Sequence, residues 1–247
     1  MSGQIFFCGD THSNFGHVLD LVNKHRPAAI VFLGDLQAQA PLQEALYPIL
    51  DLTEIWWIHG NHDTDSDADY DNLFGSTLAD RNLHGRVVDI AGRRIAGLGG
   101  IFRGQIWMPG ADPRPEERNF ESSADFLQQC GKGNRWRDGL PRKHRSSIFP
   151  AEYDALATQR ADILVTHEAP SCHPQRFKAI DDLARAMRVQ KAYHGHHHDR
   201  IDYSREWGSL SFQAIGVGFC GVTDQDGNVL LVGDFDEQRA YRRLVGD

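Results

Sequence analysis

Clusters of His, Asp and Asn occur at five places in this chain, and they restrict its fold more than any other feature of the sequence. The first three follow apolar runs at 5–8, 30–33 and 55–58, and the set is Gly9-Asp10-Thr11-His12, Gly34-Asp35, Gly60-Asn61-His62-Asp63, Thr166-His167-Glu168 and Gly195-His196-His197-His198. Short apolar runs are typical of buried strands. The clusters are therefore predicted at strand ends, where open α/β sheets bind ligands. Because these side chains bind metals, the sequence predicts a site for two metal ions.

The spacing of apolar residues predicts an α/β fold. A strand near 4–8 precedes a helix capped by Ser13 or Asn14, and the pattern repeats with a strand at 29–34, a helix that begins at Pro41 and a strand at 54–58. This order predicts a βαβαβ unit with parallel strands. The later elements are predicted as a hairpin at 86–98, helices at 151–158 and 178–187, strands at 162–166 and 190–195, and further strands from residue 201. Two mixed β-sheets with flanking helices, a four-layer α/β/β/α sandwich, accommodate this order.

Length and composition limit the possible functions. A chain of 247 residues without an internal repeat predicts a single domain over 1–247. The net charge of −8 argues against stable binding of duplex nucleic acid, which leaves small substrates. Four widely spaced cysteines, no apolar run of 18 residues and no leader of the signal-peptide kind predict reduced thiols, a cytoplasmic location and no membrane contact.

Residues 101–149 are the least regular part of the sequence, and we predict that they form a flap or cap insertion. The segment has nine Lys or Arg against six Asp or Glu, a net charge of +3, in a chain that is otherwise acidic. It also contains Phe102, Trp107, Phe120 and Trp136. Such a flap could close over an anionic, aromatic substrate. The alternative is a solvated loop with ordinary surface charge.

Each cluster by itself has a simpler explanation. Gly-Asp and Gly-Asn sequences are common in turns, and residues 196–198 could be a histidine-rich surface tract. On an extended segment, however, His196 and His198 point the same way. Asn61 offers a neutral oxygen to a metal and leaves His62 for other work. The order of all five clusters is far more specific than any one of them.

In that order the clusters resemble the motifs of the calcineurin-like metallophosphoesterase superfamily, over residues 4–198. The family pattern is GDxH, GDxx, GNH(D/E), a later His after an apolar strand, and GHxH, and this chain has GDTH, GDLQ, GNHD, THEA and GHHH. The resemblance implies that one metal is held by Asp10, His12, Asp35 and His198, and the other by Asp35, Asn61, His167 and His196. Asp35 would bridge two cations about 4 Å apart, which can acidify a shared water. Nitrogen and oxygen ligands favour two divalent transition-metal ions, with Mn first and Fe, Zn or Co as alternatives.

The resemblance also implies roles for residues that hold no metal. A hydroxide that bridges the metals would attack phosphorus, and His62 would stabilise the transition state or protonate the leaving group. Asp63 would orient His62 or anchor its loop. His197 would either reach the substrate from its loop or face solvent.

One departure from the family concerns phosphate binding. The serine/threonine phosphatases and dinucleoside tetraphosphatases of this superfamily carry an Arg shortly after the bridging Asp, whereas this chain reads Leu36-Gln37-Ala38-Gln39 there. A role as a protein phosphatase is therefore disfavoured. We expect Arg103 to contact the substrate instead, with Arg135 or Arg142 as alternatives.

Three functions follow from these observations. The leading prediction is a phosphatase or phosphodiesterase that acts on a small phosphorylated molecule or nucleotide. The second is a non-catalytic metal-binding scaffold, although all seven ligands and His62 are present. The third is a nuclease of single strands, with the arginines and tryptophans of the insertion on the backbone and bases.

Overall fold

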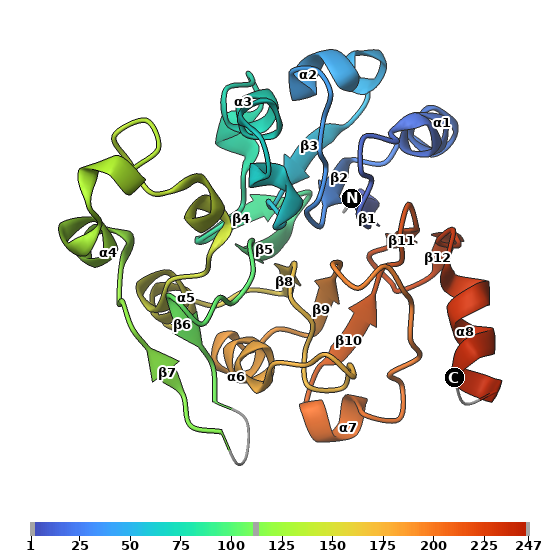
Figure 1. Ribbon diagram of the computed structural model, residues 1–247. Coiled ribbons are helices and arrows are strands. Elements are labelled where there is room, and N and C mark those ends of the chain that lie inside the picture. Colours follow the sequence, from blue (N-terminus) through green and yellow to red (C-terminus); the bar gives the residue numbers. More distant parts are fainter. Residues whose placement is uncertain (1–2, 111–113, 246–247) are drawn as a thin grey trace.

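Two β-sheets form the centre of the protein in the computed structural model, which describes residues 3–110 and 114–245 (Figure 1). Within these residues each of the two sheets has five strands. The first sheet has the order β12-β11-β1-β2-β3, with β1 Ile5–Cys8, β2 Ala29–Phe32, β3 Glu54–Trp57, β11 Val222–Asp224 and β12 Val229–Leu231. The second has the order β10-β9-β8-β5-β4, with β4 Arg86–Ile90, β5 Arg93–Leu98, β8 Ile163–Thr166, β9 Lys191–His194 and β10 Gln213–Gly216.

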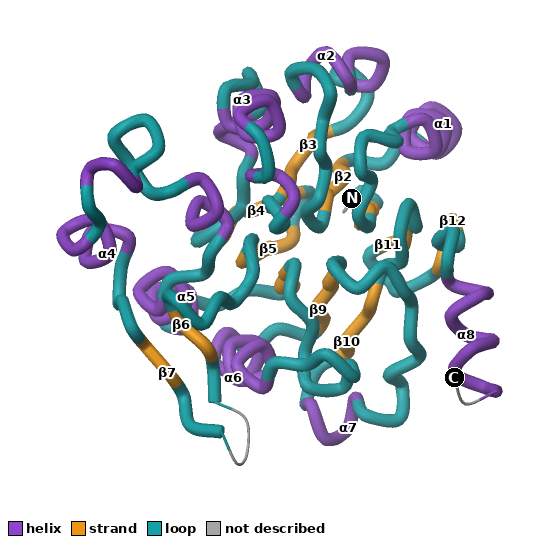
Figure 2. Tube along the Cα trace, viewed as in Figure 1, coloured by secondary structure: helices purple, strands orange, loops and turns teal. Residues whose placement is uncertain are grey.

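Helices cover the outer faces of both sheets (Figure 2). Their bounds are α1 Gly16–His25, α2 Leu42–Ala45, α3 Asp67–Phe74, α4 Ser123–Gln129, α5 Pro150–Ala157, α6 Lys178–Met187, α7 Trp207–Leu210 and α8 Asp236–Val245. Helices α1 and α3 pack on the first sheet, and α5, α6 and α7 pack on the second. Among the helices of residues 3–110 and 114–245, none combines the length and apolar character that a membrane span needs.

Successive side chains of a strand pack into different layers of the protein. In β1, Ile5 and Phe7 belong to the apolar cluster between the sheets, whereas Phe6 and Cys8 belong to the cluster under α1. This alternation follows from the two-residue period of a strand. Both faces of β1 are therefore buried, which explains its continuous apolar sequence. The predicted four-layer α/β/β/α sandwich with two mixed sheets is confirmed.

The predicted strand pairings are also present. Strands β1, β2 and β3 are parallel, and β4 and β5 form the antiparallel hairpin.

Two helices differ from prediction. Neither Ser13 nor Asn14 caps α1, which begins at Gly16 after Phe15, because both residues lie in the turn that carries His12. The helix predicted from Pro41 is a four-residue α2 followed by a 3₁₀ turn at Tyr47–Ile49.

The region from residue 201, predicted as strands, also contains α7 and α8. Helix α8 is rich in charged residues, and its Tyr241 and Leu244 are exposed. Few of its residues are apolar, so its sequence does not contain the broad apolar stripe from which a helix is usually predicted. The cysteines Cys8, Cys130, Cys172 and Cys220 are free thiols, as expected.

The segment 101–149 is packed against the body of the protein. Besides α4 it contains the short strands β6 Trp107–Met108 and β7 Glu117–Arg118, which pair with each other. Trp107 is buried in the same cluster as α6, so it presents no free surface for stacking bases. Arg137 pairs with Asp71 of α3. The basic charge of this segment is thus partly used to attach it to α3, and its role as a flap stays a prediction.

Candidate metal centre

All seven predicted metal ligands lie at the carboxyl ends of strands, where the two sheets meet. Asp10 and His12 follow β1, Asp35 follows β2, and Asn61 follows β3; His167 follows β8, and His196 and His198 follow β9. His12, Asp35, His196 and His198 have positive φ angles. Left-handed backbone at several non-glycine residues is costly and concentrates at functional sites.

Two glycines make room for these turns. Gly34 has φ +102°, and a Cβ there would lie 2.4 Å from His167 Nδ1. A Cβ at Gly60 would lie 2.2 Å from Asp35 Oδ1. The Gly-Asp and Gly-Asn sequences are therefore needed because backbone and ligand side chains approach closely.

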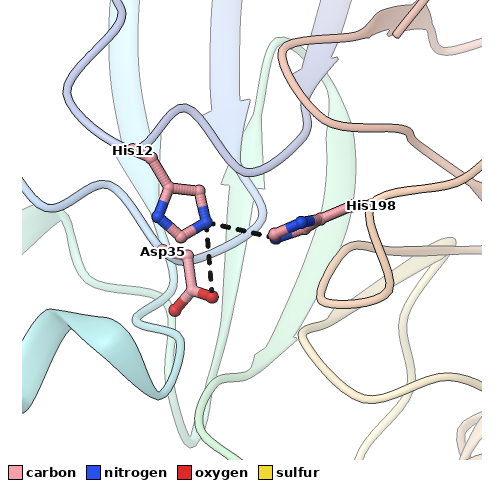
Figure 3. A group of neighbouring side chains, drawn as sticks. All are labelled: His12, Asp35 and His198. Atoms are coloured by element: carbon pink, nitrogen blue, oxygen red, sulfur yellow. Dashed lines mark hydrogen bonds and ion pairs between the residues drawn. The ribbon is translucent and has the colours of Figure 1, made fainter. Parts of the chain in front are cut away.

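The first ligand group contains His12, Asp35 and His198 (Figure 3), whose nearest nitrogen and oxygen atoms all lie within 4.8 Å of one another. His12 Nε2 is 3.1 Å from His198 Nε2 and 3.9 Å from Asp35 Oδ2. On its other side, His12 Nδ1 hydrogen-bonds to Oε1 of Gln37. Because an amide oxygen only accepts, we assign the proton to Nδ1, and the lone pair of Nε2 then points into the group.

The second ligand group contains His167 and His196 and again Asp35. His167 Nδ1 donates to the carbonyl oxygen of Leu33 at 2.8 Å. Its Nε2 therefore faces Asp35 Oδ2 at 3.3 Å and Asn61 Oδ1 at 3.2 Å with a lone pair. A backbone carbonyl behind a ligating imidazole is the usual way to hold its orientation.

Together these atoms fit divalent cations. Asp35 Oδ2 is buried and has no hydrogen-bond partner among the described residues, although two imidazole lone pairs converge on it. Lone pairs and a carboxylate repel one another unless a cation lies between them. Imidazole nitrogen with carboxylate and amide oxygen suits Mn, Fe, Zn or Co.

The ionisation of the site agrees with this demand for positive charge. Burial lowers the pKa of His196 to about 3 and that of His198 to about 4, which keeps both rings neutral as ligation requires. Burial also opposes protonation of His167, but the carboxylates of Asp35 and Asp10 outweigh it and raise the pKa of His167 to about 10. When no metal cation is bound, the imidazole of His167 takes up a proton and supplies the positive charge itself.

Asp10 lies beside the two groups and belongs to neither of them. Its carboxylate accepts the backbone N–H of His196 at 2.9 Å and lies 3.7 Å from His167 Nδ1. Burial raises the pKa of Asp10 to about 7. The structure thus shows Asp10 bound to the turn that carries His196, and its role as a metal ligand stays a prediction, as does that of Asn61.

His62 lies at the open side of the centre. Its ring centroid is 5.5 Å from that of His12, and 43% of its side chain is exposed. Its Nδ1 is 2.5 Å from Asp65 Oδ2, a contact that we did not predict. Burial disfavours the charged ring, but the hydrogen bond to Asp65 and the charge of Asp35 raise the pKa of His62 above its ordinary value.

Asp63 does not contact the His62 ring. Its carboxylate accepts the backbone N–H groups of Gln37 and Gly60, both at 2.8 Å. Of the two roles expected for Asp63, these hydrogen bonds match the anchoring of the loop. Asp65, three residues after His62, occupies the orienting position instead.

Arg103 approaches the centre from the insertion. Its Nη1 donates to the carbonyl oxygen of Ser146 at 3.1 Å. Burial lowers the pKa of Arg103, whereas the nearby charges of Glu168, Asp65 and Asp35 oppose that shift. The two alternative arginines are engaged elsewhere, because Arg135 donates to backbone carbonyls near α4 and Arg142 to those after His62.

The ring centroid of His197 lies 4.6 Å from that of His196. Glu168, His196 and His197 form a third group of neighbouring ligand-type atoms. Glu168 is buried, and its Oε1 accepts the backbone N–H of Phe102 at 2.9 Å. In the sequence, the only sign that Glu168 belongs to this site is that it directly follows His167.

Known proteins share both sequence and fold with this chain. Residues 3–200 match a family model described as calcineurin-like phosphoesterase. An uncharacterised protein of Haemophilus influenzae is 41% identical over 228 residues, which are 92% of this chain and 96% of that protein. The crystal structure of TT1561 of Thermus thermophilus has a TM-score of 0.57 at 12% identity, with 94% of this chain and 99% of that chain covered.

Proposed function

This chain belongs to the calcineurin-like phosphoesterase family, and from that premise we propose that it hydrolyses phosphate esters with two divalent metal ions held on either side of Asp35. The first ion would be held by His12, Asp35 and His198, and the second by Asp35, His167 and His196, with Asp10 and Asn61 at the edges. When bound, such ions supply Lewis acidity and lower the pKa of water.

One observation carries the proposal. The Asp35 carboxylate is shared by both ligand groups, and its buried Oδ2 faces the imidazoles of His12 and His167 without a hydrogen bond among the described residues. Burying an unpaired charge next to lone pairs is expensive. A purely structural role for these residues would not require an unpaired carboxylate oxygen beside two imidazoles. A carboxylate that two cations share does require it.

His62 is proposed as the acid that protonates the leaving oxygen. Asp65 holds Nδ1 and favours the charged ring, so Nε2 remains for the substrate. General acids work best when their pKa lies near the working pH. Asp63 keeps the loop in place through the backbone of Gly60.

Arg103 is proposed as the contact to the phosphoryl oxygens that replaces the missing family arginine. It is held by Ser146 and lies near enough to Asp35 and Asp65 for their charges to act on it. A guanidinium fixed in this way can accept charge that develops on a phosphoryl group.

Hydrolysis of an aryl phosphate monoester and of the matching diester, with Mn²⁺ added, tests the proposal. We expect turnover that falls at least about 10³-fold in Asp35→Asn, together with a loss of bound metal measured by elemental analysis. Asp51→Asn, an exposed carboxylate, should retain both properties. The ratio of monoester to diester turnover assigns the enzyme as phosphatase or phosphodiesterase. Full activity and full metal content in Asp35→Asn would contradict the proposal, and metal binding without turnover of either ester would favour the scaffold function.

A further inference from the structure

A cleft of about 640 Å³ opens next to the second ligand group. It is lined by Met108 and Pro109 of the β6–β7 hairpin and by Phe177 of the loop that follows β8. Glu168 and His196 also line this cleft. A volume of this size is typical of clefts that bind a small molecule.

His196 belongs to both the cleft and the metal centre. Its imidazole lies within 4.8 Å of the ligand atoms of Asp35 and His167, and the same residue lines the cleft. A phosphoryl group bound at the metal centre would therefore lie at one end of the cleft. The organic group of the substrate can then extend into the remaining space.

The lining of the cleft indicates what that organic group is. Most of the exposed surface of the cleft is apolar, and the rings of Phe102 and Phe177 lie 4.7 Å apart. Phe102 is fixed from behind by an edge-to-face contact with Trp107 at 4.9 Å. The ring of Phe177 is only partly buried, so one side remains for a ligand. Such a fixed aromatic wall suits another flat ring.

We infer that this cleft binds the organic group of the substrate and selects esters whose organic group is aromatic, such as a nucleoside or an aryl group, over small alkyl phosphates. The inference rests on the proposed function, because it places the phosphoryl group at the metal centre. The apolar wall provides affinity for the ring, and the polar residues Glu168, His197 and Arg176 lie where they can orient it.

Phenylphosphonate and methylphosphonate separate the cleft from the metal centre, because they share the phosphonate and differ only in the organic group. Calorimetric titration of the Mn²⁺-loaded protein should show phenylphosphonate binding at least roughly ten times more tightly, since a ring buries apolar surface that a methyl group does not. Phe177→Ala should reduce this ratio to near one while methylphosphonate binds as before. Phe120→Ala is the matched control, because both rings are partly buried against the same apolar cluster. It should keep the ratio, because Phe120 is not among the residues that line the cleft.

Equal affinity for the two phosphonates in the wild-type protein would overturn the inference and leave the proposed function standing. An unchanged ratio in Phe177→Ala would also overturn it. If Phe177→Ala does not fold, Phe177→Leu keeps the apolar volume and should lose most of the preference. Failure of both phosphonates to bind the metal-loaded protein would instead contradict the proposed function.

Discussion

At the scale of single residues, two side chains of the centre are oriented by groups that face away from it. Gln37 holds Nδ1 of His12, and the carbonyl oxygen of Leu33 holds Nδ1 of His167. Each contact selects the tautomer whose Nε2 lone pair points at Asp35. The proposed chemistry of the centre would thus depend on residues that are not among the predicted metal ligands.

Replacement of Gln37 tests this dependence. Gln37→Leu removes the acceptor behind His12, so the ring can rotate or change tautomer, and we expect metal affinity to fall about 10- to 100-fold. Competition with a chelating dye measures the affinity. Gln39→Leu is the control, because Gln39 is exposed and has only a long contact to Ser13. Equal affinities in the two variants would show that Gln37 does not orient His12.

In the proposed reaction, Asp65 would act through His62 and not through the metals. In Asp65→Asn we expect kcat to fall roughly tenfold for a good leaving group and further for a poor one, because protonation matters most for a basic leaving oxygen. A series of aryl phosphates with leaving groups of increasing pKa measures the slope. Asp80→Asn, an exposed carboxylate, should leave the slope unchanged. A uniform loss across the series would instead indicate a structural role for Asp65.

At the scale of elements, the start of α5 is tied to the loop before β4. Glu152 accepts the backbone N–H of Phe149 at 3.2 Å, and its Oε2 is 3.2 Å from His84 Nε2. Burial favours the neutral acid, but the hydrogen bonds from His84 and from the backbone N–H of Phe149 outweigh it, so the pKa of Glu152 is lowered. His84 in turn accepts the backbone N–H of Gly99 next to the metal centre.

This lowered pKa makes a stability prediction with a defined sign. Ionised Glu152 stabilises the fold above its ordinary pKa of 4.5, and the contribution is lost as the pH falls through the lowered value. Because 36% of the side chain is exposed, we expect Glu152→Gln to reduce the free energy of unfolding by only about 0.5–1 kcal/mol at pH 7. Urea unfolding at pH 7 and pH 3 should show the difference shrinking in acid. Glu121→Gln, with 60% exposure, should change little at either pH.

At the scale of the whole molecule, the candidate metal centre lies where the two sheets meet. Asp35 comes from the first sheet, whereas His167 and His196 come from the second. Tyr193 of β9 joins the sheets nearby, because its ring stacks on Phe7 of β1 at 3.8 Å. Its hydroxyl also donates to the carbonyl oxygen of Asp224 in β11 at 3.0 Å.

Loss of that hydroxyl should weaken the junction between the sheets. Tyr193→Phe removes this hydrogen bond, although the carbonyl oxygen of Asp224 keeps the backbone N–H of Gly227, and we expect the free energy of unfolding to fall by about 1 kcal/mol. Tyr47→Phe, at a residue that is 76% exposed, should have no effect. Urea unfolding followed by fluorescence measures both. An equal stability for all three proteins would show that the hydroxyl contributes nothing at this junction.

Metal removal should act on the same junction, because ions bound by both sheets stabilise only the folded state. We expect a chelator to lower the Tm of the wild-type protein by several degrees, since ligand at 100 times its Kd contributes about 2.7 kcal/mol. The Tm of Asp35→Asn, which lacks the shared ligand, should respond much less. A Tm that is insensitive to chelator in the wild-type protein would contradict tight metal binding.

The sequence by itself determined the strands, the layers and the order of the ligand clusters, because these depend on local periodicity and on turns such as Gly34-Asp35. Only the tertiary structure decided which side chains surround these ligand clusters. Of the two roles predicted for Asp63, its hydrogen bonds match loop anchoring, whereas Asp65 contacts His62, because loop geometry sets where a carboxylate points. The aromatic wall of Phe102 and Phe177 joins residues 75 positions apart, and no local pattern encodes such a contact.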